Sequence, residues 1–435
     1  MTESKQLGGI KAFIVLWLGQ LVSLVGSRIT NFGLRVVVFQ TTTSVTQFAL
    51  ISVCTILPVI LLSPFAGVIV DRFDRRRVII ISDFGAFLTT VAIALLLLTG
   101  NLEVWHIYLT TAISSAFSAF QWPANIASVS MLVPKKHLPR ASGLTQLGKA
   151  ISQLISPILG AVMLVTVKLE GIILLDLITF IFSIFTLSLV RFPKLKTNIS
   201  QQLSPALVLK EIGEGCKYIA ARLGIFGLII FLAGINFLVG AVEVLATPLI
   251  LSFASTTTLG TILSIGGIGM VLGGVLFSIY PQARGYINIT FNFTLLVGFC
   301  IVAAGLKASV ILVSSAIFIV FFSLPFINGS SLLIFQRKVA LEMQGRFFAI
   351  NDTIAKTSLL VAYLITGPLA DRIFEPLMDI KGLLANNVGQ IIGVGPGRGI
   401  GLLFVIMGTL TMLLTIMAYQ YPPLRFIEDS SPVQK

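Results

Sequence analysis

The sequence predicts an all-α integral membrane protein with twelve transmembrane helices arranged as two pseudo-symmetric six-helix bundles. Three observations predict this: long apolar stretches recur along the chain, basic residues are distributed unevenly between the loops, and the two halves resemble each other. Of the 435 residues, 56% are hydrophobic and only 11% are charged, whereas soluble domains carry about 25% charged residues. A soluble enzyme, a nucleic-acid-binding protein and a disordered regulator are therefore poor interpretations.

A helix needs roughly 20 mostly apolar residues to cross a bilayer. The first such stretch is too long for a signal-peptide core, so we interpret it as a membrane span. The twelve predicted spans are 13–39, 46–70, 77–99, 104–133, 143–167, 171–190, 223–251, 258–280, 286–306, 309–335, 346–369 and 399–420.

Loop charges predict the orientation of these spans. Of the 30 Lys and Arg residues, 21 fall in the termini and loops on one side and 5 on the other, while Arg28, Arg35, Lys149 and Lys356 fall inside spans. Positive loops stay in the cytoplasm, so both termini are predicted to be cytoplasmic. The net charge of +13 then reflects topology, and no nucleic-acid partner is expected.

A polar stretch divides the chain into an N-terminal six-helix half (1–190), a cytoplasmic linker (191–222), and a C-terminal half with a short cytoplasmic tail (223–435). The linker contains an interfacial amphipathic helix by its pattern, with four apolar residues on one face: Leu209, Ile212, Cys216 and Ile219.

The two halves repeat at an offset of about 206 residues. Gly67 matches Gly274, Arg77 matches Arg284, and the loop around Arg140 matches the loop around Arg346. Parallel repeats of this kind are a known transporter plan, in which the substrate site lies between the halves near the midplane of the bilayer.

The loop between the second and third spans reads GVIVDRFDRRR, from Gly67 to Arg77. It resembles the major facilitator superfamily signature G-x-L-A-D-R-x-G-R-R, with Asp74 in place of the second glycine. Segments 121–144 and 367–376 are similar to the efflux branch that includes drug, macrolide and enterobactin exporters. The resemblance covers all twelve spans and implies a multi-pass protein of the cytoplasmic (inner) cell membrane.

This loop has the residue types of a conformational latch. Gly67 lets helices approach closely, and Asp71 can face the positive end of a helix dipole. Arg72 belongs to the same loop. Arg75 and Arg76 can reach carboxylates or helix C-termini on neighbouring spans. These contacts would hold the cytoplasmic side shut while the pocket faces outward. The alternative is that the arginines only enforce topology.

The fifth span contains Ser156, Pro157 and Gly160, which resemble part of the antiporter element G-x-x-x-G-P-x-x-G-G of exporters. Proline and small residues bend a span and allow close packing. The alternative to an antiporter role is therefore ordinary helix packing.

Ionisable residues inside spans are functional candidates because their insertion is costly. Arg35 and Glu243 lie at similar depth in spans 1 and 7, which the resemblance implies line the cavity. We predict that they pair when the outer side is closed and that Glu243 takes a proton when they separate; a static salt bridge is the alternative. Asp352, a third candidate for proton coupling, lies four residues before Lys356 and can be neutralised by it.

Two further acids lie inside spans. Asp83 could brace the latch, and Asp176 could extend to the outer interface. Six polar residues on spans 1, 4, 7 and 10 predict a wet, mostly uncharged substrate cavity, although each alone could be a packing hydrogen bond: Gln20, Asn31, Gln121, Asn125, Asn236 and Asn328.

The three cysteines and two histidines form no ligand pattern, so we expect no metal, no cofactor and no catalytic residues. We expect a secondary active transporter that works as a monomer by alternating access. Its predicted activity is proton-coupled export of a bulky, largely apolar compound, such as a drug, a macrolide-like molecule or a siderophore. The alternatives are an importer of the same fold and a non-transporting membrane receptor or scaffold.

Overall fold

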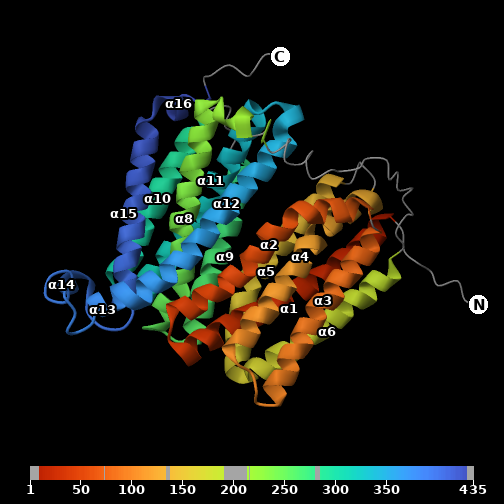
Figure 1. Cartoon of the computed structure of the whole chain (residues 1–435), viewed down its shortest axis with the longest axis horizontal. Helices are drawn as coiled ribbons and strands as arrows, with labels where there is room; N and C mark the ends of the chain where they lie inside the picture. Colours follow the sequence, from red (N-terminus) through yellow and green to blue (C-terminus); the bar gives the residue numbers. More distant parts are fainter. Residues whose placement is uncertain are drawn as a thin grey trace, which may run out of the picture. The chain divides into compact units, whose positions relative to one another are not determined.

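The computed structural model describes residues 9–72, 74–133, 138–190, 213–214, 216–279 and 285–428. Its regular elements over these ranges are helices (Figure 1). The first half contributes six long helices: α1 (Gly9–Thr42), α2 (Val45–Arg72), α3 (Arg75–Leu98), α4 (Val104–Leu132), α5 (Leu138–Thr166) and α6 (Lys168–Leu189).

The second half contributes another six long helices: α8 (Leu223–Leu251), α9 (Thr256–Ile279), α10 (Tyr286–Leu306), α11 (Val310–Lys338), α12 (Leu341–Leu369) and α15 (Arg398–Gln420). Four shorter elements follow α12 or α15: the π-helix η2 (Ala370–Phe374), α13 (Glu375–Leu377), α14 (Gly389–Ile392) and α16 (Pro422–Arg425).

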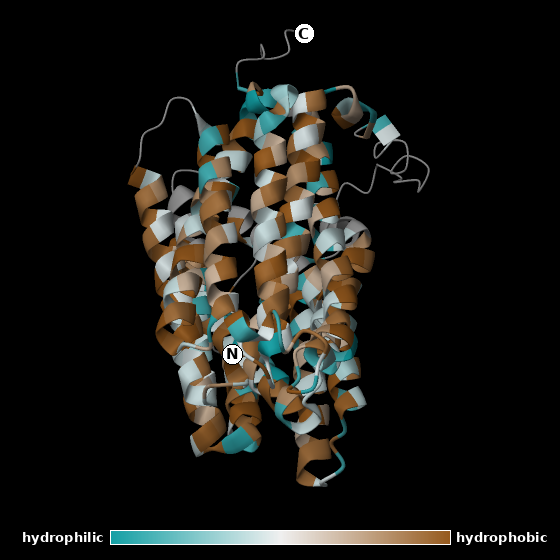
Figure 2. Ribbon diagram, turned by 90° about the vertical axis from the view of Figure 1, so that its left-hand side faces the viewer, coloured by the Kyte–Doolittle hydropathy of each residue, from teal (hydrophilic) through white to brown (hydrophobic). Residues whose placement is uncertain are grey.

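The long helices confirm the predicted all-α membrane fold. Over the described residues, eleven are long and apolar enough to cross a membrane, and the remaining one, α4, is 29 residues long. The predicted spans agree with the helix ends to within about five residues, and spans 223–251 and 286–306 coincide with α8 and α10. Hydrophobic residues run along the helices of both halves (Figure 2), as a bilayer requires.

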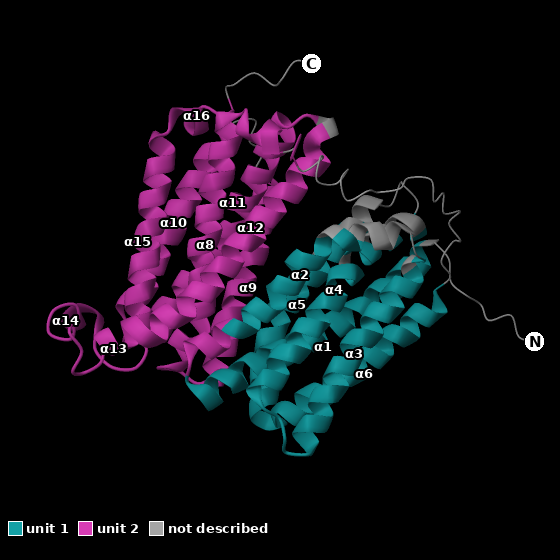
Figure 3. Cartoon of the chain, in the orientation of Figure 1, with its two compact units in different colours: residues 1–43, 50–200 teal, residues 44–49, 201–435 magenta. Residues whose placement is uncertain are grey.

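The chain forms two compact units (Figure 3). Unit 1 comprises residues 1–43 and 50–200, and unit 2 comprises residues 44–49 and 201–435. Within unit 1, α1 packs against α5 and α6, and α3 packs against α4 and α6. Within unit 2, α11 packs against α9 and α10, α15 against α10 and α8, and α12 against α8.

Close approach of α1 and α6 depends on glycines spaced seven residues apart. A Cβ atom at Gly19 would overlap Thr186, and a Cβ atom at Gly26 would overlap Thr179. Seven residues are about two helical turns, so both glycines lie on the same face of α1. Small residues let membrane helices pack with their backbones close together. This contact was not predicted from the sequence, although the seven-residue spacing of the glycines was a signal for it.

Acidic side chains hold several helix N-termini. Asp74, the residue that departs from the signature, caps α3 by accepting a hydrogen bond from the backbone N–H of Arg76 at 2.9 Å. In unit 2, Glu375 accepts hydrogen bonds from two backbone N–H groups at the start of α15. Glu428 does the same at the start of α10. A carboxylate is favoured there by the unpaired N–H groups and the helix dipole.

Residues 191–212 and 215 of the linker lie outside the described residues, as does most of the predicted amphipathic helix. The described end of the linker belongs to unit 2 and contacts residues at the start of α12. Glu214 forms a salt bridge of 2.8 Å with Arg346, and the Tyr218 hydroxyl accepts a hydrogen bond of 3.0 Å from the backbone N–H of Ala340. These contacts hold the last part of the linker at the start of α12.

Candidate functional site

A buried polar network joins α1, α3, α4 and α6 in unit 1. Asp83 of α3 lies at its centre with no exposed surface. Gln20 of α1 donates hydrogen bonds of 3.0 Å to Asp83 Oδ2 and of 3.0 Å to Ser183 Oγ on α6. Gln121 of α4 donates to the other carboxylate oxygen of Asp83, and Asn125 Nδ2 donates to Gln20 Oε1 at 3.2 Å. Two of the six predicted cavity residues therefore bind one carboxylate, and a third, Asn125, joins the network through Gln20.

The other three predicted cavity residues lie elsewhere. Asn31 is exposed and donates to the carbonyl of Ser27 on its own helix at 2.8 Å. Asn236 is half-buried and Asn328 is exposed, both in unit 2. The predicted cavity lies between the two halves, and no contact among the described residues within either unit forms it. The cavity therefore stays a prediction.

A second carboxylate, Asp176 of α6, lies in the same part of unit 1. Its side chain is 2% exposed, so the expectation that it extends to the interface is wrong. Asp176 Oδ1 accepts a hydrogen bond of 3.1 Å from Ser27 of α1, and Oδ2 accepts one of 3.3 Å from Thr90 of α3. The small and hydroxyl-bearing residues around it supply enough donors for the carboxylate to stay buried.

Asp83 and Asp176 each lie in a polar layer formed by side chains of α1, α3 and α6. Ser27, Thr90 and Asp176 are each seven residues from their counterparts Gln20, Asp83 and Ser183. Seven residues correspond to about 10 Å along a helix. These layers were not predictable from the sequence, because their members come from three helices far apart in the chain.

The predicted coupling residues occupy different units. In unit 2, the exposed side chain of Glu243 accepts a hydrogen bond of 3.1 Å from the Tyr363 hydroxyl. In unit 1, Arg35 is half-buried, and its Nε atom has no hydrogen-bond partner among the described residues. Pairing of Arg35 with Glu243 stays a prediction. Asp352 and Lys356 do form the expected i,i+4 salt bridge, at 2.7 Å.

The predicted latch is only partly described. Helix α2 ends at Arg72 and α3 begins at Arg75. The side chains of Gly67, Asp71, Arg72 and Arg75 lie outside the described residues. The Arg76 guanidinium donates to the carbonyl of Ser188, in the last turn of α6, at 3.4 Å. This is a contact with a helix C-terminus, as predicted for this arginine, but the latch role stays a prediction.

The predicted antiporter element of span 5 packs α5 against α1. The Ser156 hydroxyl donates to the carbonyl of Val25 at 3.5 Å. A Cβ atom at Gly160 would lie 2.7 Å from the ring of Phe32. Pro157 lies inside α5. These contacts show helix packing, and a role in antiport stays a prediction.

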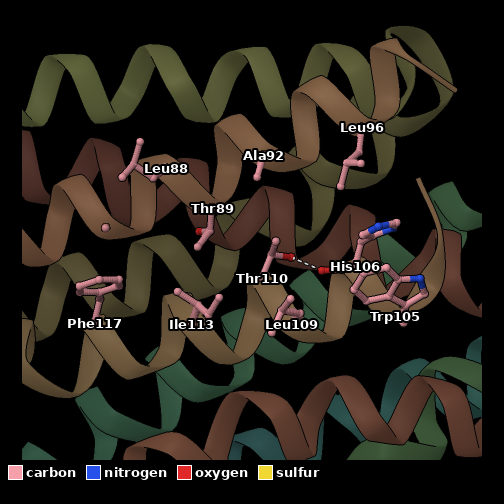
Figure 4. A pocket seen from close by; sticks show the side chains of 11 residues that line it. Leu88, Thr89, Ala92, Leu96, Trp105, His106, Leu109, Thr110, Ile113 and Phe117 are labelled. Carbon is pink, nitrogen blue, oxygen red and sulfur yellow. Dashed lines mark hydrogen bonds between the residues drawn. The ribbon is translucent and has the colours of Figure 1, made fainter. Parts of the chain in front are cut away.

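A groove of about 380 Å³ lies between α3 and α4 (Figure 4). Its lining is apolar, and Leu88 and Leu109 are half-exposed. Its two threonines, Thr89 and Thr110, donate their hydroxyls to backbone carbonyls of their own helices. Most of the lining is apolar, and an apolar face of this kind suits lipid chains better than a polar substrate.

The fold and the charge-poor helices define a multi-pass membrane protein. Residues 16–363 match the family model of the Major Facilitator Superfamily, so the chain belongs to this family. Over 371 residues it is 27% identical to "Macrolide efflux protein A" of Streptococcus pyogenes, which covers 83% of this chain and 90% of that protein. Over 155 residues it is 26% identical to the enterobactin exporter EntS of Citrobacter koseri, which covers 36% of this chain and 37% of that protein.

The fold is also similar to solved structures. A bacterial homologue of the iron transporter ferroportin, in an inward-facing state, aligns with a TM-score of 0.68 and 14% identity, covering 95% of this chain and 99% of that chain. These comparisons confirm the predicted family, its efflux branch and the twelve-helix fold. They identify the protein as a transporter and not an enzyme.

Proposed function

We propose that this transporter exports a bulky, largely apolar compound from the cell in exchange for protons. The observation that carries this proposal is the similarity to a macrolide efflux protein over most of both chains. The composition supports it, because only 11% of the residues are charged. Spans with few fixed charges suit an apolar drug, a macrolide-like molecule or a lipophilic siderophore better than a sugar phosphate or an amino acid.

Transport proceeds by alternating access of a site between the two halves. The loop from Gly67 to Arg76 acts as the cytoplasmic latch, and the contact of Arg76 with the end of α6 supports this role. Glu243 is the coupling candidate in unit 2. Its side chain is exposed in that unit and accepts a hydrogen bond from the Tyr363 hydroxyl, so it is placed to exchange protons.

The protein resides in the cytoplasmic membrane with both termini in the cytoplasm, as its loop charges predict. It works as a monomer, and its partners are the substrate, protons and the lipid bilayer.

A substrate panel assay in proteoliposomes tests the proposal. Macrolides, lipophilic dyes and a catecholate siderophore are offered to the purified protein with and without an imposed pH gradient. We expect at least one of these compounds to be transported faster when protons can flow in the opposite direction. Counterflow in inside-out vesicles separates export from import. Equal transport rates with and without the pH gradient would contradict the proton-exchange mechanism.

A further inference from the structure

We propose that Asp83 is a second proton-binding site of this transporter, located in unit 1 and coupled to the amides of α1 and α4. This inference rests on the proposed proton-coupled export. The structure shows a carboxyl group with no exposed surface, which is held by two glutamine amides from different helices and by the Ser183 hydroxyl of α6.

Burial makes the charge of this group costly. Among the residues that the structure describes, Asp83 forms no salt bridge with any basic group. An isolated charge away from water costs much free energy unless it is paired, and a bound proton removes that cost. Asp83 can therefore alternate between two states: a carboxylate that depends on the amides around it, and a neutral acid.

The ionisable groups on the described parts of the four helices are few, and the closest in sequence to the network lie about two helical turns away. Helix α3 carries Arg77 and Arg76 six and seven residues before Asp83, and α6 carries Asp176 seven residues before Ser183. Arg76 is bound to the end of α6. The other ionisable groups on these helices whose side chains the structure describes are Lys11, Arg28 and Arg35 on α1, Arg76 and Arg77 on α3, His106 and Tyr108 on α4, and Lys168, Glu170 and Asp176 on α6.

The hydrogen bonds around Asp83 connect its charge to the positions of α1 and α4. As a carboxylate it accepts N–H groups from Gln20 on one oxygen and from Gln121 on the other. As an acid it carries an O–H donor, which cannot face an amide N–H. Gln20 cannot simply turn over, because its carbonyl oxygen accepts from Asn125 and its amide nitrogen also donates to Ser183. A proton on Oδ1 therefore requires Gln121 of α4 to break or reverse its hydrogen bond to α3, and a proton on Oδ2 requires the O–H to face the Ser183 hydroxyl in place of the Gln20 N–H.

Asp176 provides the contrast. Its hydrogen-bond donors, Ser27 and Thr90, are hydroxyls. A hydroxyl can donate or accept by rotating its proton. Asp176 can therefore change protonation without moving a helix. Asp176 is a matched control, because it is a buried aspartate among α1, α3 and α6 whose protonation requires no change in the positions of these helices.

The test uses the full-length protein and the variants Asp83→Asn and Asp176→Asn. Asparagine keeps the size of the side chain but cannot bind a proton. Infrared difference spectra of each purified protein between pH 5.5 and 8.5 report the carbonyl band of protonated carboxyl groups. We expect a contribution to that band in the wild type that is lost in Asp83→Asn and retained in Asp176→Asn. Transport driven by a pH gradient should fall at least tenfold in Asp83→Asn, while exchange of labelled for unlabelled substrate persists.

An undiminished band or full pH-driven transport in folded Asp83→Asn would overturn the inference while leaving proton-coupled export intact. If the proposed proton-coupled export is wrong, transport by the wild type itself would not respond to the pH gradient, so the two failures can be distinguished. If Asp83→Asn cannot be purified, Gln121→Met keeps the carboxyl and removes one amide donor. The pH at which the band appears should then move by about one unit, as the loss of one hydrogen bond predicts. An unchanged midpoint would also overturn the inference.

Discussion

Asp371 should determine how firmly the first turn of α2 is held. Asp371 Oδ2 accepts hydrogen bonds from the Ser44 hydroxyl at 2.6 Å and the Thr46 N–H at 2.8 Å, and Oδ1 accepts from the Val45 N–H at 2.9 Å. One turn earlier, Gly367 lies so close to Thr46 that a Cβ atom there would be 2.7 Å from its Cα. Asp371 thus caps a helix that starts more than three hundred residues earlier in the chain.

The structure sets the size of the expected effect. Loss of a helix cap costs about 0.5–2 kcal/mol, and a hydrogen bond to a charged group contributes about 1.5–3 kcal/mol. Asp371 is half-buried, so we expect Asp371→Ala to lower the free energy of opening this turn by about 2 kcal/mol. Since about 1.4 kcal/mol is a factor of ten, amide hydrogens in 44–49 should exchange about 30-fold faster.

Hydrogen exchange with mass spectrometry on the peptide covering 44–49 measures this effect. Asp371→Asn keeps an oxygen acceptor and should show a smaller change. Arg372→Ala removes the exposed neighbouring side chain and should leave the exchange unchanged. Equal protection of 44–49 in Asp371→Ala and the wild type would refute the assignment of this carboxylate as the cap of α2.

The remaining predictions concern transport, orientation and packing. Asp71→Asn and Arg75→Ala should each cut transport by about tenfold or more without loss of membrane insertion, and near wild-type transport in both would leave topology as the only role of the loop. A cysteine in 381–396 should react with impermeant reagents in intact cells while one in the loop between α2 and α3 reacts only with permeant reagents; the reverse labelling would overturn the orientation. Glu243→Gln should weaken transport driven by a pH gradient but leave substrate exchange intact, and unchanged coupling in the folded variant would rule out its role. Gly26→Leu should destabilise unit 1 by about 1–3 kcal/mol, seen as a lower thermal midpoint in detergent, because the added side chain forces α1 away from α6; an unchanged midpoint would contradict the close contact.

Hydropathy and charge in the sequence determined the secondary structure and the class of protein. A span is a local property, since about 20 apolar residues in a row must form a helix to satisfy their backbone in lipid. The predicted span 223–251 therefore coincides with α8. The ion pair of Asp352 with Lys356 was equally predictable, because both residues lie on one helix at a fixed spacing.

Contacts between helices were decided only by the tertiary structure. Asp83 could be assigned to span 3 from the sequence, but its partners Gln20, Gln121 and Ser183 lie on three other helices. The sequence therefore suggested a brace for the latch, and the fold placed Asp83 at the centre of a buried network. Likewise, nothing near Asp371 in the chain indicates the start of α2 as its partner. Hydropathy specifies that a helix spans the membrane, but its rotation about its own axis is set by packing against its neighbours, and that rotation decides which polar side chains meet.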